Sequence, residues 1–270
     1  MSEDSTRMFG NDADAYELYM GRWSRLVAPR FLEWLAIPTS QKWLDVGCGT
    51  GTLTQAIIDL GNPESVHGID TSSGFVDRAR QFTADDRATF EAFDAGALPV
   101  ESDQFDAVVS GLVLNFLPDV DLGLAEMVRA VKPDGTVAAY VWDYAGKMEV
   151  MRSFWDVALK LDPAAAAFDE GQKEPMLCQP EPLSDHFSHA GLVNVEVQSI
   201  DVGAHFENFD DYWLPFTGNQ GSAPKYLATL DDKSRSALKQ QLSAALPVSE
   251  DGSIELIARS WAVSGKRPIR

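Results

Sequence analysis

The sequence predicts an α/β fold, in which a mostly parallel sheet of about seven strands carries helices on both faces and helical cap insertions. Three observations predict it. Apolar runs alternate with helical patterns between residues 41 and 145, a glycine-rich turn follows the first run, and two further strand patterns come late in the chain. Alternation of this kind is typical of βαβ units, whose strands lie parallel.

Five apolar runs supply the expected parallel strands, and they span 42–46, 65–69, 88–93, 105–109 and 136–141. Helical patterns lie among them at about 51–60, 73–83 and 119–132, the last ended by the turn Lys132-Pro133-Asp134-Gly135. Right-handed crossovers would place helices on both faces. The carboxyl ends of the strands then form one rim, where ligands of open α/β sheets bind.

The pattern changes after residue 145. Residues 147–161 predict an amphipathic helix, 163–182 a connection, about 181–190 a helix, 193–200 an alternating strand, 207–250 an aromatic helical region and 254–263 a final strand. A length of 270 residues permits one α/β domain with insertions or two domains. We expect one domain over 41–270, with cap insertions at about 146–180 and 207–250, preceded by a helical lid at 1–40.

The composition argues against nucleic acid or an anionic membrane as the main partner. Lys and Arg number 22 against 41 Asp and Glu, a net charge of −19, whereas both partners require a basic surface. Cys48 and Cys178 form neither a disulfide framework nor a Cys-x-x-Cys metal site. The polar N-terminus is unlike a signal peptide, and no apolar run is long enough for a membrane span. We therefore expect a soluble cytoplasmic protein.

A glycine-rich turn, Leu44-Asp-Val-Gly-Cys-Gly-Thr-Gly-Thr52, joins the first strand to the first helix. Glycines at 47, 49 and 51 let the backbone turn sharply and let a ligand approach its N–H groups. The spacing is G-x-G-x-G, which differs from the G-x-G-x-x-G of dinucleotide folds. A tight turn without a ligand is the alternative.

Three aspartates, Asp45, Asp70 and Asp94, lie at the ends of the first three strands. Each alone is equally well explained as a helix cap or a turn residue. Three in register suggest a ligand that offers an amine, a ribose and an adenine to separate carboxylates, and they suit a pyrophosphate poorly.

Together these motifs resemble the class I S-adenosylmethionine-dependent methyltransferases, in particular the branch that methylates small molecules. The resemblance covers about 41–143 strongly and the rest loosely, and it is carried by Leu44–Gly51, Asp70, Asp94-Ala95, Leu98-Pro99, Phe105–Val108, Leu112, Leu114 and Lys132–Gly135. It implies a Rossmann-like fold and S-adenosyl-L-methionine as cofactor. The implied reaction moves a methyl group to a small, partly apolar acceptor and leaves S-adenosylhomocysteine.

The resemblance also implies roles for the matching positions in the first two strands. Asp45, Gly47 and Gly49 would line the methionine part of the cofactor. Asp70 would hold the ribose, and Thr71 would pack against the adenine.

Later positions complete the implied cofactor site. Asp94 and the Ala95 amide would read the adenine edge, while Ser110 and Gly111 would border the sulfonium. In the family a helix before the first strand closes over the cofactor, and Tyr16–Arg25 resembles it. Arg22 would then pair with the cofactor carboxylate; a solvated helix arginine is the alternative.

Methyl transfer from a sulfonium is an in-line displacement, so the protein mainly has to align the reactants and exclude water. No catalytic residue is obligatory. If the acceptor requires a base, Asn115, Asp143 and Tyr144 are candidates by position. For Asn115 and Asp143, a structural role in capping a helix or turning the chain is favoured over a role as base.

The histidines and aromatic residues give less information about function. His186 and His189 share a helix face without a third ligand in sequence reach, so we expect no metal site. Seven aromatic residues fall in segments expected above the rim and could line an acceptor pocket or pack between helices: Trp142, Tyr144, Phe154, Trp155, Tyr212, Trp213 and Phe216.

Two other functions stay open at this point. An NAD(P)-dependent oxidoreductase would share the glycine turn and Asp70, but it leaves Asp94 unexplained. A protein that binds S-adenosylmethionine without turnover is the second. The acceptor atom and the oligomeric state are not determined by the sequence.

Overall fold

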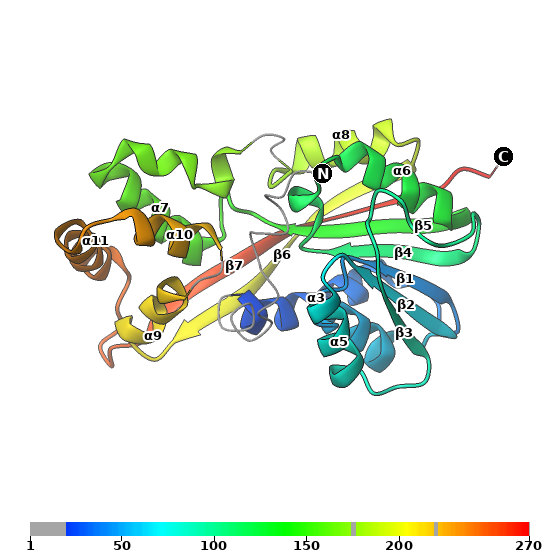
Figure 1. Cartoon of the computed structure of the whole chain (residues 1–270), viewed down its shortest axis with the longest axis horizontal. Coiled ribbons are helices and arrows are strands. Elements are labelled where there is room, and N and C mark those ends of the chain that lie inside the picture. The colour runs from blue at the N-terminus through cyan, green and yellow to red at the C-terminus, as the bar shows by residue number, and fades with distance from the viewer. Residues whose placement is uncertain (1–19, 174–176, 219–220, 270) are drawn as a thin grey trace.

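The computed structural model describes residues 20–173, 177–218 and 221–269, and Tyr16, with the rest of 1–19 of the expected lid, lies outside these ranges. One seven-stranded sheet has the order β3-β2-β1-β4-β5-β7-β6 (Figure 1). Neighbouring strands among β1–β5 pair in parallel, and β7 is antiparallel to both β5 and β6. The strands are β1 Lys42–Val46, β2 Ser65–Asp70, β3 Ala88–Ala92, β4 Phe105–Gly111, β5 Val131–Trp142, β6 Val193–Phe206 and β7 Ile254–Lys266. The predicted fold class is confirmed.

Helices cover both faces of the sheet. Figure 1 shows α3, α4 and α5 on one side and α6 and α8 on the other. Their bounds are α3 Arg22–Leu35, α4 Thr52–Ala56, α5 Ser73–Phe82, α6 Val120–Ala130 and α8 Pro180–His189. The predicted helix at 51–60 is α4 followed by a π turn at Ile57–Gly61.

The last two strands are longer than the sequence predicts. Pairing of β7 with β5 ends at Trp142 opposite Ser260, but β6 and β7 continue as a two-stranded ribbon as far as Phe206 opposite Ile254. The ribbon projects from the sheet and carries helices from both insertions (Figure 1). We call this region the cap; its helices are α7 Glu149–Leu161, α9 Phe209–Trp213, α10 Ser222–Thr229 and α11 Asp232–Ala245.

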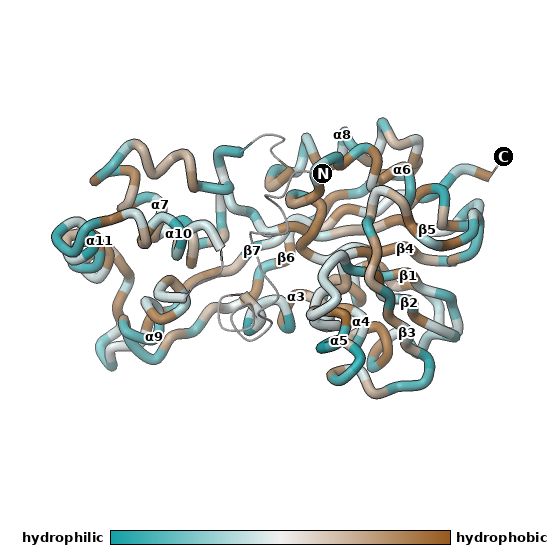
Figure 2. The backbone as a smooth tube through the Cα atoms, in the orientation of Figure 1, coloured by the Kyte–Doolittle hydropathy of each residue, from teal (hydrophilic) through white to brown (hydrophobic). Residues whose placement is uncertain are grey.

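Aromatic rings in stacked and edge-on contacts fill the interior of the cap. Phe154 lies 4.7 Å from Phe216, ring centre to ring centre, and Phe206 lies 5.1 Å from Tyr212. All four side chains are buried, and burial of each contributes roughly 1.5–3 kcal/mol to stability. In Figure 2 the central strands are brown and hydrophobic, whereas α11 is mostly teal, as expected for a helix that covers the core with one face.

Candidate active site

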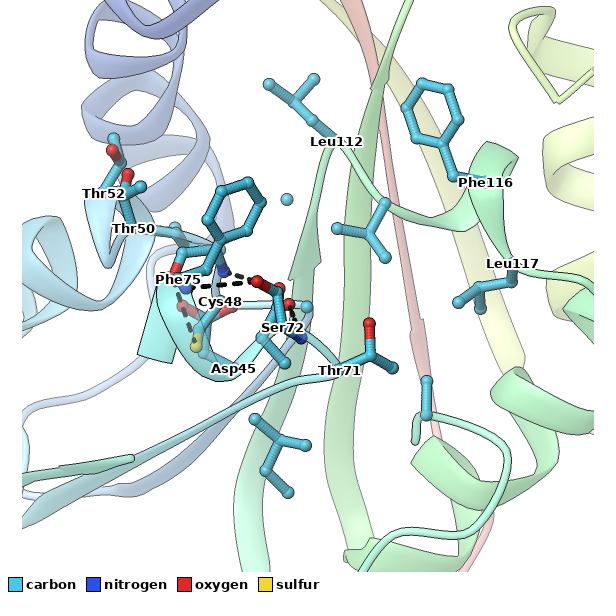
Figure 3. A pocket seen from close by; sticks show the side chains of 18 of the residues that line it. Asp45, Cys48, Thr50, Thr52, Thr71, Ser72, Phe75, Leu112, Phe116 and Leu117 are labelled. Carbon is cyan, nitrogen blue, oxygen red and sulfur yellow. Dashed lines mark hydrogen bonds between the residues drawn. The ribbon is translucent and has the colours of Figure 1, made fainter. Parts of the chain in front are cut away.

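A cavity of about 270 Å³ opens where β1, β2 and β4 end (Figure 3). The sheet order reverses between β1 and β4, and ligands of open α/β sheets bind at such a switch point. One side of the cavity, the polar side, consists of the glycine turn and the ends of β2 and β3. The other, the apolar side, consists of Met20, Leu112, Val113, Phe116, Leu117, Pro118, Tyr140, Trp142 and Tyr144.

The glycine turn brings bare backbone to the cavity. Gly47 has φ +76°, and a Cβ there would lie 2.5 Å from a methyl of Val113. Gly49 has φ +53°, and a Cβ built there would have no other atom within 4 Å. The N–H groups of Gly47 and Cys48 donate to the Ile69 carbonyl at 2.7 and 2.9 Å, which ties the turn to the end of β2. The turn can therefore accept a ligand at Gly49, whereas Gly47 is required by the packing.

Alanine substitutions at Gly47 and Gly49 should distinguish a glycine required for packing from one required for binding of the ligand. Gly47→Ala is expected to lower the melting temperature most, because positive φ costs about 1–2 kcal/mol and the Val113 clash adds to it. Gly49→Ala should weaken cofactor binding with a smaller loss of stability. Gly252→Ala, with φ +91° and no neighbour within 4 Å, is the matched control for strain alone. Thermal unfolding and calorimetry with S-adenosylhomocysteine measure both effects, and equal affinities in all three variants would contradict this interpretation.

Asp45 places an unpaired carboxylate oxygen at the polar side. Its side chain is fully buried; Oδ2 accepts a 2.7 Å hydrogen bond from the Thr54 hydroxyl, while Oδ1 has no partner among the described residues. Burial raises the pKa of Asp45 to about 7. A buried acceptor at a cavity wall fits a cationic donor such as an ammonium group.

Asp70 and Asp94 complete the row of strand ends. Asp70 accepts hydrogen bonds at 2.9 Å from the N–H groups of Gly49 and Ser72, and burial raises the pKa of this carboxyl. Each of its oxygens keeps a lone pair for a further donor, such as a ribose hydroxyl. Asp94 is exposed at the cavity mouth, where its carboxylate accepts from the Gly96 N–H at 2.8 Å. Asp70 thus both shapes the glycine turn and faces the cavity.

The apolar side has two walls. One is formed by Leu112, Phe116 and Leu117, on the segment that follows β4 (Figure 3). Tyr140 and Trp142 stand two positions apart at the end of β5 and therefore face the same side of the sheet, and Tyr144, in the turn just after the strand, lines the same cavity. The sequence analysis gave no site role to Tyr140 or to the lining residues of 112–118, although the spacing of two between Tyr140 and Trp142 was readable in the sequence.

The structure brings most of the predicted cofactor residues to this cavity. Asp45, Gly47, Gly49, Asp70, Thr71, Asp94, Ala95 and Gly111 line it. Ser110 does not, because successive strand residues face opposite sides and Ser110 lies on the side of Val108; it is fully buried. Lining residues that the sequence analysis did not single out include Cys48, Thr50, Ser72, Phe75 and Phe93.

The expectation for Arg22 needs correction. Its guanidinium donates to the His205 carbonyl at 2.6 Å and to Asp211 at 3.2 Å, and it lies 4.7 Å from the centre of the Phe206 ring. These partners hold Arg22 at the base of the cap, outside the cavity, while Met20 and Ser24 from the same segment line it. Arg22 therefore joins α3 to α9, and the structure does not support its pairing with the cofactor carboxylate.

Of the three candidate bases, Tyr144 alone lines the cavity. Asp143 accepts from the Lys147 N–H at 2.8 Å and turns the chain after β5, as the alternative for this residue expected. Asn115 lies in a short 3₁₀ turn, Leu114–Phe116, and is not among the lining residues. Of the seven aromatic residues, Trp142 and Tyr144 line the cavity, and the other five pack within the cap.

No group of three or more His, Cys, Asp or Glu side chains within 20–173, 177–218 and 221–269 could hold a metal ion. His186 instead lies 2.8 Å from Asp121, which joins α8 to α6. Among the helices of these same ranges, none is long and apolar enough to cross a lipid bilayer.

Fold and site together define a class I methyltransferase domain: the strand order 3-2-1-4-5-7-6 with β7 antiparallel, a glycine turn after β1 and acidic ends on β1 to β3. Residues 44–139 match the family model described as a methyltransferase domain. The resemblance to the class I S-adenosylmethionine-dependent methyltransferases is therefore confirmed over this part of the chain. This match favours a methyltransferase over the oxidoreductase alternative.

Curated relatives act on small molecules. The chain is 29% identical over 167 residues to a 2-methyl-6-phytyl-1,4-hydroquinone methyltransferase of Synechocystis, a match that covers 61% of this chain and 50% of that enzyme. It is 29% identical over 186 residues to a demethylmenaquinone methyltransferase of Staphylococcus aureus, covering 64% of this chain and 77% of that enzyme. The chain thus spans about half the length of the first relative.

Solved structures share the fold. A candidate methyltransferase of Bacillus halodurans superimposes with a TM-score of 0.59 at 14% identity, over 90% of this chain and 99% of that one. A phosphoethanolamine N-methyltransferase of Haemonchus contortus, in complex with S-adenosylhomocysteine, superimposes with a TM-score of 0.57 at 19% identity, over 95% of this chain and 57% of that one.

Proposed function

We propose that this protein methylates a small, planar aromatic acceptor of the hydroquinone type. The observation that carries the proposal is the wall formed by Tyr140, Trp142 and Tyr144, which faces the same cavity as the acidic strand ends. Flat aromatic walls with few polar groups suit a flat apolar ligand. The two curated relatives named for a hydroquinone and for demethylmenaquinone support the same class.

Charge favours this acceptor over a phosphorylated amine. No lysine or arginine lines the cavity among the residues that the structure describes, and binding of a phosphate requires such cations or free N–H groups. The net charge of −19 further disfavours an anionic acceptor. The acceptor of the Haemonchus enzyme, a phosphoethanolamine, is therefore the poorer model for this cavity.

The residues of the polar side fit the cofactor. The unpaired Oδ1 of Asp45 would accept from the ammonium of the methionine part, and the open space at Gly49 admits its backbone. Asp70 would accept from the ribose hydroxyls, with Thr71 beside the adenine and Asp94 and Ala95 at its edge. When bound, S-adenosylmethionine supplies a methyl group activated on a sulfonium.

The chain contributes alignment and exclusion of water. The wall of Tyr140, Trp142 and Tyr144 would hold the acceptor ring flat, with its nucleophilic atom toward the polar side beyond Gly111. Leu112, Phe116 and Leu117 close the opposite wall with apolar atoms, which keeps water from the reacting centre. A hydroquinone is electron-rich, so it can attack the methyl group as the bond from that methyl to sulfur breaks, and the proton that the acceptor then loses can pass to solvent without an obligatory general base.

The decisive experiment incubates the purified protein with S-adenosylmethionine and an alkylated 1,4-hydroquinone, or phosphoethanolamine in a parallel assay, and measures release of S-adenosylhomocysteine. Turnover with the hydroquinone, and a rise of its KM by about tenfold in Trp142→Ala, is expected, since that change removes the middle of the wall. Turnover with phosphoethanolamine in its place would refute the acceptor class. Cofactor binding without turnover on any acceptor would favour the silent binding protein.

A further inference from the structure

Residues of the first cap insertion contact the backbone carbonyl of Tyr144. One guanidinium nitrogen of Arg152, on α7, donates to the Tyr144 carbonyl at 3.2 Å and to both carboxylate oxygens of Asp169 at 2.8 and 2.9 Å. The other guanidinium nitrogen donates to Asp156 at 2.8 Å. Asp169 is fully buried, so the pair with Arg152 is shielded from water and fixed in place.

The turn after Asp169 presses against the same carbonyl. Asp169 accepts from the Gly171 N–H at 2.9 Å and begins a 3₁₀ turn, Glu170–Gln172. A Cβ at Gly171 would lie 2.5 Å from the backbone carbonyl oxygen of Tyr144 and 2.9 Å from its carbonyl carbon. Backbone atoms cannot rotate away from such a contact, so glycine at this position lets the turn approach Tyr144 closely.

We propose that Arg152, Asp169 and Gly171 set the position of Tyr144 in the apolar side of the cavity and thereby tune the fit of the acceptor. Arg152 and Asp169 are positioning residues, because they act through Tyr144 and none of the three lines the cavity. The link to acceptor fit rests on the proposed function. The link to Tyr144 rests on the contacts alone.

A Gly171→Ala variant tests the contact, and Gly203→Ala is its matched control. Gly203 lies in β6, has no atom within 4 Å of a built Cβ, and does not line the cavity. Arg152→Lys is a milder second variant, since one ammonium keeps the charge but loses the planar fork that reaches Asp156, Asp169 and Tyr144 together. It keeps the test available if Gly171→Ala does not fold.

The direct readout is the ¹⁹F resonance of Tyr144 in protein labelled with 3-fluorotyrosine, assigned by its loss in Tyr144→Phe. We expect this resonance to shift in Gly171→Ala and Arg152→Lys and to stay in place in Gly203→Ala. A Tyr144 resonance that does not move in either test variant would overturn the proposal. This measurement requires no acceptor.

The functional readout compares the acceptor with the cofactor. We expect the KM for the alkylated hydroquinone to rise about fivefold or more in Gly171→Ala while the Kd of S-adenosylhomocysteine is unchanged, because displacement of a positioning contact acts on orientation. In a Tyr144→Ala background the Gly171 change should add nothing. A parallel rise of KM and Kd, or an undiminished effect without the Tyr144 side chain, would refute positioning. If the wild type does not methylate the hydroquinone, the proposed acceptor class fails, and the resonance alone decides on positioning.

Discussion

Asp70→Ala is expected to weaken the binding of S-adenosylhomocysteine by about a hundredfold or more, the largest effect of any single change at the polar side. The variant would lose the proposed acceptor of the ribose hydroxyls. It would also leave the N–H groups of Gly49 and Ser72 without the carboxylate that holds the glycine turn in place. The single change would therefore remove a contact to the ligand and also disturb the shape of the glycine turn. Titration calorimetry measures the change in Kd.

Asp77→Ala is the matched control for that experiment. Asp77 lies on the neighbouring helix α5, its side chain is 67% exposed, and it pairs with Arg80 at the surface. We expect affinity close to that of the wild type. Asp70→Asn should lie between the two, since an amide keeps one acceptor oxygen and the shape of the side chain. Full affinity in a folded Asp70→Ala protein would disprove the role of the strand ends.

Asp45→Asn is expected to weaken cofactor binding at pH 8 by about tenfold to a hundredfold and to remove its pH dependence. In the wild type, burial raises the pKa of Asp45 to about 7. Below that pH the carboxyl is protonated and offers the ammonium no charge, so affinity should fall as pH drops from 8 to 6. Calorimetry with S-adenosylhomocysteine across this range compares the slopes. Equal slopes in the two proteins would mean that another group titrates.

The same change should stabilise the protein without ligand at neutral pH. The folded pKa of Asp45, about 7, lies above the value of 3.8 for an unperturbed carboxyl, so between these pH values the folded state binds a proton that the unfolded chain has released. Stability of the wild type therefore falls as pH rises through that window, by at most about 4 kcal/mol from this residue. Asparagine can keep the Thr54 hydrogen bond and is not ionised. Denaturant unfolding at pH 5 and pH 8 should show a smaller fall in Asp45→Asn.

Local features of the site could be predicted from the sequence. The glycine turn and the aspartates at strand ends depend on chain geometry within a few residues, so Asp45, Asp70 and Asp94 were found together at one cavity. The spacing of two between Tyr140 and Trp142 at the end of β5 was equally local, yet Tyr140 was missed because candidates were sought only beyond the expected strand end at residue 141.

Contacts between residues far apart in the chain could not be predicted from the sequence. The partner of Arg22, Asp211, lies 189 positions away in the chain, and nothing near Arg22 signals that pairing. The sequence allowed both roles for the seven aromatic residues but could not assign them individually, because the packing of the other five in the cap joins segments far apart in the chain. The ribbon contains the part of β6 beyond the predicted strand, 201–206, which pairs with 254–259 of β7 after the sheet ends.

The position of β7 between β5 and β6 has a consequence for synthesis on the ribosome. The β6 segment cannot join the sheet until Ile254–Lys266 has left the exit tunnel, because β7 is its neighbour. The half that includes β1 to β5 can assemble earlier from segments close in sequence, whereas α9 to α11 must wait for their support. Nascent chains halted before residue 254 should already protect the glycine turn from proteases while Phe209–Ala245 is still cleaved.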